Sequence, residues 1–80
     1  MRVVEDIAHP EMKITLLSWN GKYLLKFEKG DFEQTYKISE MEVGDDKAAK
    51  ALIDEEFLES VTNRFQDMRD IFVSTVRRNG

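Results

Sequence analysis

The last third of the chain, Asp54 to Arg78, has the sequence DEEFLESVTNRFQDMRDIFVSTVRR. When its residues are placed at about 100° per step, the apolar side chains gather on one side and the charged ones on the other. The apolar side holds Ile53, Phe57, Leu58, Val61, Phe65, Met68, Ile71, Phe72 and Val76. Its arc of about 160° is wider than the roughly 100° that a surface helix needs to cover one core. The pattern therefore predicts an amphipathic helix that contacts both its own sheet and a partner.

Two runs typical of β-strands precede this helix, at 12–19 and 22–29, with Asn20-Gly21 between them. Asn-Gly best tolerates the positive φ angles of a two-residue type I′ turn, so these runs predict a hairpin. The register set by this turn makes one face of the hairpin almost wholly apolar. The facing residues there are Ile14 with Phe27, Leu16 with Leu25, and Ser18 with Tyr23.

A third strand is predicted at 32–38, after a turn at Lys29-Gly30 or Gly30-Asp31, because apolar and polar residues alternate there. Val3, Val4 and Ile7 leave open a fourth, short strand at the edge. The predicted fold class is therefore α+β, with a three- or four-stranded antiparallel meander followed by a long C-terminal amphipathic helix packed on one face.

The connection to the helix contains two signals. Gly44-Asp45-Asp46 offers an N-cap for a helix over about 46–78, while Asp54-Glu55-Glu56 resembles a second N-cap with an acidic first turn. We therefore expect a break near Asp54. The preceding connector, 39–44, is expected to hold a short extended piece at 41–43.

A helix over 54–78 is about 37 Å long, whereas an eight-residue strand covers about 27 Å. We therefore expect the helix to run past the sheet. Apolar side chains on the protruding part need a second surface, and the simplest one is another copy related by a two-fold axis. The residues predicted at this dimer interface are Phe57, Met68, Ile71, Phe72 and Val76.

The composition also favours self-association. A chain of 80 residues buries only about 60% of its unfolded surface, so it is marginally stable alone. The absence of cysteine excludes disulfides and thiolate metal sites. Neither a signal peptide nor an apolar run long enough to cross a membrane is apparent. We expect a single domain, 1–80, in the cytoplasm.

The formal net charge of −4 disfavours phosphate binding as a main role, because nucleic-acid-binding modules usually carry a basic surplus. Acidic and basic residues balance up to Ile38, however, so the whole negative surplus lies after it. The first half of the chain therefore stays compatible with a nucleic-acid partner.

No motif for catalysis, metal binding or phosphate binding stands out. His9, beside Pro10, is expected to be an exposed turn residue, with a general base or metal ligand as the alternative. The runs Asp45-Asp46 and Asp54-Glu55-Glu56 lack calcium-loop spacing and lie where helix N-termini favour negative charge. We therefore expect no enzymatic activity, no cofactor and no metal.

The second face of the meander is the most suggestive surface. Its candidate binding residues are Lys13, Leu17, Trp19, Lys22, Leu24, Lys26 and Lys37. Aromatic and cationic side chains interleaved on a sheet are typical of single-stranded nucleic-acid binders. The alternatives are a protein interface and an ordinary solvated face, on which Lys26 pairs with Glu33 or Thr35.

Three segments carry a family resemblance: Trp19-Asn20-Gly21-Lys22-Tyr23, Phe32-Glu33-Gln34-Thr35-Tyr36-Lys37 and Asp54-Glu55-Glu56-Phe57-Leu58. They resemble a family of short uncharacterised bacterial proteins, a domain of unknown function, and this resemblance implies no functional residues. In architecture only, strands followed by one dimerising helix are similar to the class of single-stranded-DNA-binding transcriptional coactivators and Whirly proteins. The chain differs from that class in being acidic and in lacking a lysine-rich loop.

Together these features predict a small non-enzymatic homodimeric interaction or regulatory module, whose main partner is a second copy, with a different protein partner as a further candidate. The alternative is a single-stranded nucleic-acid-binding protein that uses the outer face of the sheet. No membrane partner is expected.

Overall fold

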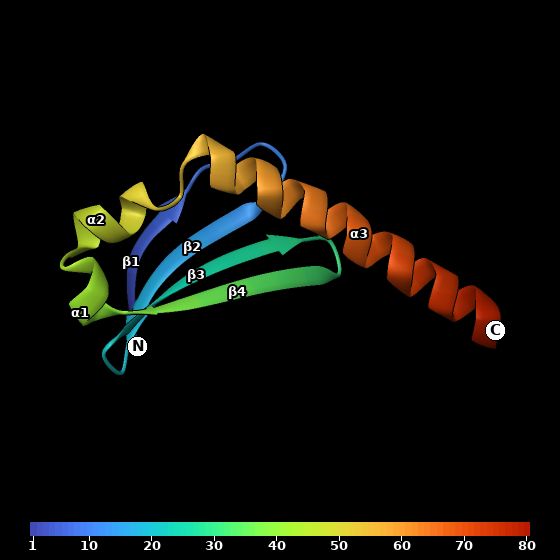
Figure 1. Ribbon diagram of the computed structural model, residues 1–80, viewed down its shortest axis with the longest axis horizontal. Helices are drawn as coiled ribbons and strands as arrows, with labels where there is room; N and C mark the ends of the chain where they lie inside the picture. The colour runs from blue at the N-terminus through green and yellow to red at the C-terminus, as the bar shows by residue number, and fades with distance from the viewer.

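The computed structural model describes residues 1–80 and contains a four-stranded antiparallel sheet followed by helices (Figure 1). The strands lie side by side in chain order, so the sheet is a simple meander. The elements are β1 (Arg2–Ile7), β2 (Lys13–Trp19), β3 (Lys22–Lys29), β4 (Phe32–Ser39), α1 (Glu40–Val43), α2 (Asp46–Ala51) and α3 (Glu55–Asn79). The predicted α+β class is confirmed, with four strands.

The turn between β2 and β3 has the predicted geometry. Asn20 and Gly21 have φ angles of 54° and 76°, both positive as a type I′ turn requires. Trp19 and Lys22 face each other across the turn, and the predicted pairs follow along the hairpin. The turn chemistry and the apolar pattern thus select the same register.

The second turn uses the later of the two predicted positions. Lys29 faces Phe32, so Gly30 and Asp31 form the loop, and the positive φ of Gly30 (59°) fits the first loop position of a type II′ turn. At the other edge, the register between β1 and β2 shifts between Val3 and Glu5, which identifies a β-bulge.

The core lies between one face of the sheet and the helices. Nine buried residues form it: Met12, Ile14, Leu16, Tyr23, Leu25, Phe27, Ala49, Val61 and Phe65. Phe27 is fully buried, and the Phe57 ring meets it edge-on at a centroid distance of 5.4 Å. The apolar arc of α3 therefore covers the face that the strand alternation predicts.

The long helix is interrupted where the sequence predicts a break. α2 ends at Ala51, and the Asp54 side chain then caps α3 by accepting a hydrogen bond from the Phe57 N–H at 2.8 Å. The predicted extended piece at 41–43 is wrong, because these residues belong to α1. The Ser39 side chain caps that helix by accepting a hydrogen bond from the Met41 N–H.

The C-terminal part of α3 protrudes beyond the sheet (Figure 1). The helix has 25 residues, and the molecule is 46 Å long but only 25 and 18 Å across. Ile71, Phe72 and Val76 are 68%, 56% and 52% exposed, since they lie at or beyond the end of the sheet. The overhang expected from the element lengths is therefore present.

Candidate interaction surfaces

The overhang of α3 carries an apolar surface formed by Ile71, Phe72 and Val76, which we call the overhang patch. Phe72 makes the last aromatic contact with the sheet, edge-on to the Phe32 ring at 6.1 Å between centroids. Beyond it the helix has no sheet beneath it (Figure 1). Phe72 and Val76 continue the buried row of Val61 and Phe65 at helical spacing. The patch is therefore an extension of the core-facing side into solvent.

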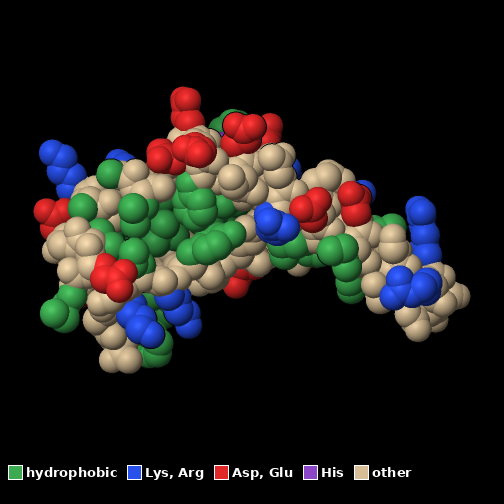
Figure 2. All heavy atoms as spheres, viewed as in Figure 1, with side chains coloured by type: hydrophobic (Ala, Val, Ile, Leu, Met, Phe, Trp, Pro, Cys, Tyr) green, Lys and Arg blue, Asp and Glu red, His purple; other side chains and the backbone are tan.

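A second apolar surface lies beside the edge strand β4. It is a groove of about 300 Å³ between β4 and the junction of α2 with α3, and we call it the β4 groove. Its apolar lining residues are Leu25, Tyr36, Ile38, Leu52 and Phe57, joined by Lys37. Figure 2 shows hydrophobic side chains gathered in the middle of the viewed face and again along the overhang. One side of the molecule therefore presents two separate apolar surfaces.

The break between α2 and α3 creates the β4 groove. Leu52 lies in the turn after α2, outside both helices, and is 41% exposed, while Tyr36 across the groove is 40% exposed. The Tyr36 hydroxyl donates a hydrogen bond to Gln34 Oε1 at 2.6 Å, and its ring meets Phe57 edge-on at 5.1 Å. The polar end of Tyr36 is thus satisfied, and the ring remains as an apolar wall.

The five residues predicted at a dimer interface fall into two groups. Phe57 and Met68 are partly buried and pack against the core of their own chain. Ile71, Phe72 and Val76 are exposed and form the overhang patch. Tyr36, Ile38 and Leu52 were not predicted as surface residues. Strand alternation predicts only that Tyr36 and Ile38 face the core, and Leu52 is not part of the apolar pattern of the helix.

The outer face of the sheet, opposite α3, holds the seven predicted binding residues. Leu17 and Leu24 are buried within it, whereas Trp19 is half exposed beside its cross-strand neighbour Lys22. Lys26 forms ion pairs with Glu28 at 3.7 Å and Glu33 at 3.4 Å, as one alternative predicted. Lys13, Lys22 and Lys37 form no ion pair. This face therefore offers three free cations and one aromatic ring.

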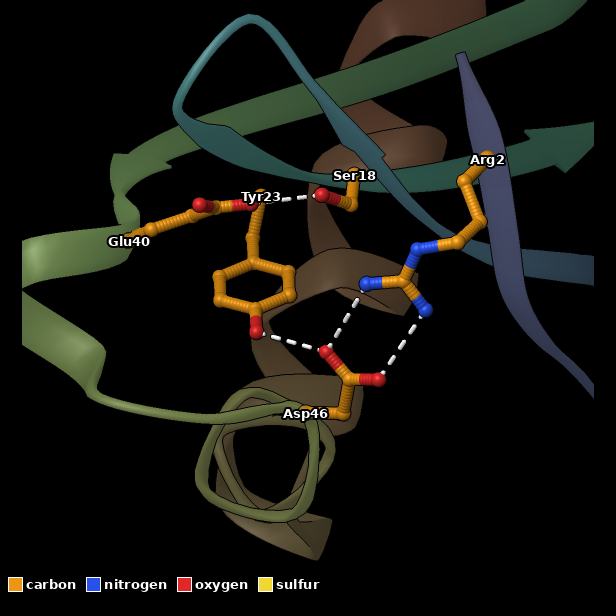
Figure 3. Close-up of polar contacts among 5 residues, drawn as sticks. All are labelled: Arg2, Ser18, Tyr23, Glu40 and Asp46. Atoms are coloured by element: carbon orange, nitrogen blue, oxygen red, sulfur yellow. Dashed lines mark hydrogen bonds and ion pairs between the residues drawn. The ribbon is translucent and has the colours of Figure 1, made fainter.

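A polar cluster joins the start of the sheet to the short helices (Figure 3). Arg2 binds the Asp46 carboxylate through two hydrogen bonds of 3.0 and 3.2 Å, and the Tyr23 hydroxyl donates to the same carboxylate at 2.6 Å. The Ser18 hydroxyl donates to Glu40 at 2.5 Å. These contacts fix α2 against β1 and β3, and α1 against β2.

The cluster changes the acidity of its members. The hydrogen bonds from Arg2 and Tyr23 to the Asp46 carboxylate hold the pKa of Asp46 below its usual value. The same bond, with help from desolvation, favours the neutral phenol and raises the pKa of Tyr23 to about 12. Because these groups satisfy one another, the cluster has the character of a structural clamp. Arg2 and Asp46 are 44 positions apart in sequence, so no local pattern predicts their pairing.

The remaining candidate residues have local roles. His9 lies in a turn, where its Nδ1 accepts a hydrogen bond from the Glu11 N–H at 3.1 Å. Asp45 caps α2 by accepting from the Ala48 N–H at 2.8 Å, so the predicted capping by the acidic runs is confirmed here and at Asp54. The structure contains no cluster of three or more histidine, cysteine or acidic side chains that could hold a metal ion. None of its helices is long and apolar enough to cross a membrane.

Comparison with known proteins identifies no relative of this chain. No protein family, curated protein or solved structure matches the chain. The two resemblances stated from the sequence stay predictions. A functional assignment therefore rests on the chemistry of the surfaces described above.

Proposed function

We propose that the protein is a small cytoplasmic, non-enzymatic module that forms a homodimer and acts through protein association. The observation that carries this proposal is the overhang patch, in which three large apolar side chains protrude on one helix. Burial of apolar surface contributes roughly 25 cal/mol per Å², and apolar patches on a protein surface often mark sites of association. A second copy supplies the missing cover.

The size of the core supports the same proposal. Only 13 of the 80 residues are buried, and the chain has no cysteine to add a covalent link. Small domains without disulfides or metals commonly gain stability through oligomerisation. The overhang provides an apolar surface for that purpose.

The proposal is tested by the mass of the protein in solution. At micromolar concentration, light scattering should give about twice the chain mass of 9.4 kDa. Val76→Glu should give a monomer, because it places a charge within the overhang patch without changing the core. Met41→Glu is the matched control, since Met41 is 94% exposed on α1. A well-folded wild-type monomer would contradict the proposal.

The second candidate function is single-stranded nucleic-acid binding on the outer face of the sheet. The observation that favours it is the half-exposed Trp19 beside Lys22, with Lys13 and Lys37 also free of ion pairs. Stacking of a base on an aromatic ring contributes about 1–3 kcal/mol, and free lysines bind phosphates in a salt-dependent manner. The single exposed ring and the acidic net charge make this the second choice.

This second candidate is tested by fluorescence anisotropy with a labelled oligonucleotide at low and moderate salt. Binding that weakens with salt and is lost in Trp19→Ala would promote it above the dimer module. No binding at low salt would remove it. Tyr36→Ala, at an exposed aromatic residue that lies on the opposite face, is the control and should leave any binding unchanged.

A further inference from the structure

The β4 groove and the overhang patch face the same side of α3. Phe57 lines the groove, and the patch residues Ile71, Phe72 and Val76 lie 14, 15 and 19 positions after it. At 100° per residue, Ile71 is rotated about 40° to one side of Phe57, and Phe72 and Val76 about 60° and 100° to the other. The 14 positions from Phe57 to Ile71 correspond to about 21 Å along the helix axis. One chain therefore has a receiving surface beside the start of α3 and a protruding surface at its end, on the same broad side of the helix.

No chain can place its own overhang patch in its own β4 groove. Phe57 in the groove and all three residues of the patch belong to one unbroken helix, so the distance between groove and patch is fixed within a chain. The groove is lined by five apolar side chains and one lysine, which suits an aliphatic or aromatic occupant. The overhang patch supplies both kinds of side chain, and its exposed position lets it reach another molecule.

The charges at the two ends of α3 select the orientation. The helix starts with the acidic residues Glu55 and Glu56 and ends with the basic residues Arg77 and Arg78. Figure 2 shows acidic side chains above the start of this helix and basic ones at its far end. Two antiparallel helices place the arginine end of each beside the acidic start of the other, whereas parallel helices would bring like charges together.

We propose that the overhang patch of each chain docks in the β4 groove of a second copy, with the two α3 helices antiparallel. This inference rests on the proposed homodimer and specifies its interface. A two-fold axis makes both contacts at once, because each chain brings one patch and one groove. The arrangement differs from one in which two overhangs pack on each other, and from one in which two β4 edges pair.

The first experiment measures the dimer dissociation constant of groove variants by sedimentation. Leu52→Glu should raise this constant at least 10-fold, because it places a charge at the rim of the groove outside both helices. Met41→Glu, at a more exposed residue that lines neither the groove nor the patch, should leave it unchanged. If Val76→Glu abolishes the dimer while Leu52→Glu leaves it intact, the homodimer stands and this inference fails. If the wild-type chain is a monomer, both fail.

The second experiment identifies the contact directly. The chain has no cysteine, so introduced thiols react without background. A mixture of Leu52→Cys and Val76→Cys chains, treated with a short bis-maleimide linker, should give a covalent dimer on a denaturing gel. Neither variant alone should do so, and a mixture of Met41→Cys with Val76→Cys is the control. Efficient linking of Val76→Cys to itself would overturn the inference, because it would place the two overhangs against each other.

Discussion

The two halves of α3 have the same apolar periodicity but different surroundings. In the first half, Val61 and Phe65 are only 1% and 4% exposed, because the sheet lies beneath them. In the second half, Phe72 and Val76 continue the same row, yet more than half of each side chain is in solvent. Periodicity therefore identifies the apolar side of a helix, whereas the length of the sheet decides how much of that side is covered.

The largest effect that tests this comparison is expected in the covered half. Phe65→Ala should lower the free energy of unfolding by about 3–5 kcal/mol, because it removes a ring from the middle of the core and leaves a cavity. Urea denaturation followed by circular dichroism measures this loss. A value below about 1 kcal/mol would mean that the first half of α3 is not held as the structure shows.

The same substitution in the overhang should have a smaller effect on the single chain. Phe72→Ala should cost about 1–2 kcal/mol, from partial burial and the edge-on contact with Phe32. The measurement is made by denaturation at a concentration low enough to keep the chain monomeric. A loss as large as that of Phe65→Ala would remove the distinction between the two halves.

The N-cap residue Asp54, where the covered half of α3 begins, should contribute less to stability than the core residues of that half. Asp54→Ala should cost about 1 kcal/mol, because it leaves the Phe57 N–H without its side-chain acceptor. Asp54→Asn is the control, since asparagine also caps helices well and should retain most of the stability. Equal losses in both variants would assign the effect to charge and not to the cap.

The smallest effect is expected at the polar cluster, as a dependence of stability on pH. Because the pKa of Asp46 is lowered by folding, its contribution is present above the unfolded-state value of about 4 and is lost as the pH falls below it. Tyr23 has the opposite sign. Its pKa is raised to about 12, so its contribution is complete below about pH 10 and is lost between about pH 10 and 12.

Asp46→Asn tests both ends of this profile, because it removes the charged partner of Arg2 and Tyr23. Thermal unfolding between pH 2 and 12 should show weaker pH dependence at the acidic and the alkaline end than in the wild type. Asp31→Asn, in the turn between β3 and β4, is the control and should keep the wild-type profile. An unchanged profile in Asp46→Asn would mean that the cluster does not couple folding to proton binding.

Much of the fold follows from short-range signals in the sequence. The Asn20-Gly21 pair determines the hairpin register, and the acidic N-cap at Asp54 marks the helix break, because both act within a few residues. The helical turn at α1 was missed because its cap, Ser39, lies at the end of a strand where alternation dominates. The expected dimer and the expected nucleic-acid surface stay predictions.

The surfaces were less predictable because they depend on residues that are distant in sequence. Tyr36 and Leu52 form the β4 groove only after a strand and a helix break have come together. Arg2 and Asp46 likewise meet only because the meander returns the chain to its first strand. Strand alternation assigned Tyr36 to the core face of the sheet. It carries no information on whether a helix covers that part of the face.

The bulge in β1 has a consequence for aggregation. An exposed regular strand can recruit further strands and grow into a fibre, and an irregular edge resists such growth. β1 is irregular between Val3 and Glu5, while β4 pairs with β3 without a shift along its whole length. Of the two edges, β1 therefore resists the addition of a further strand, and the regular β4 is the edge at which such a strand can pair.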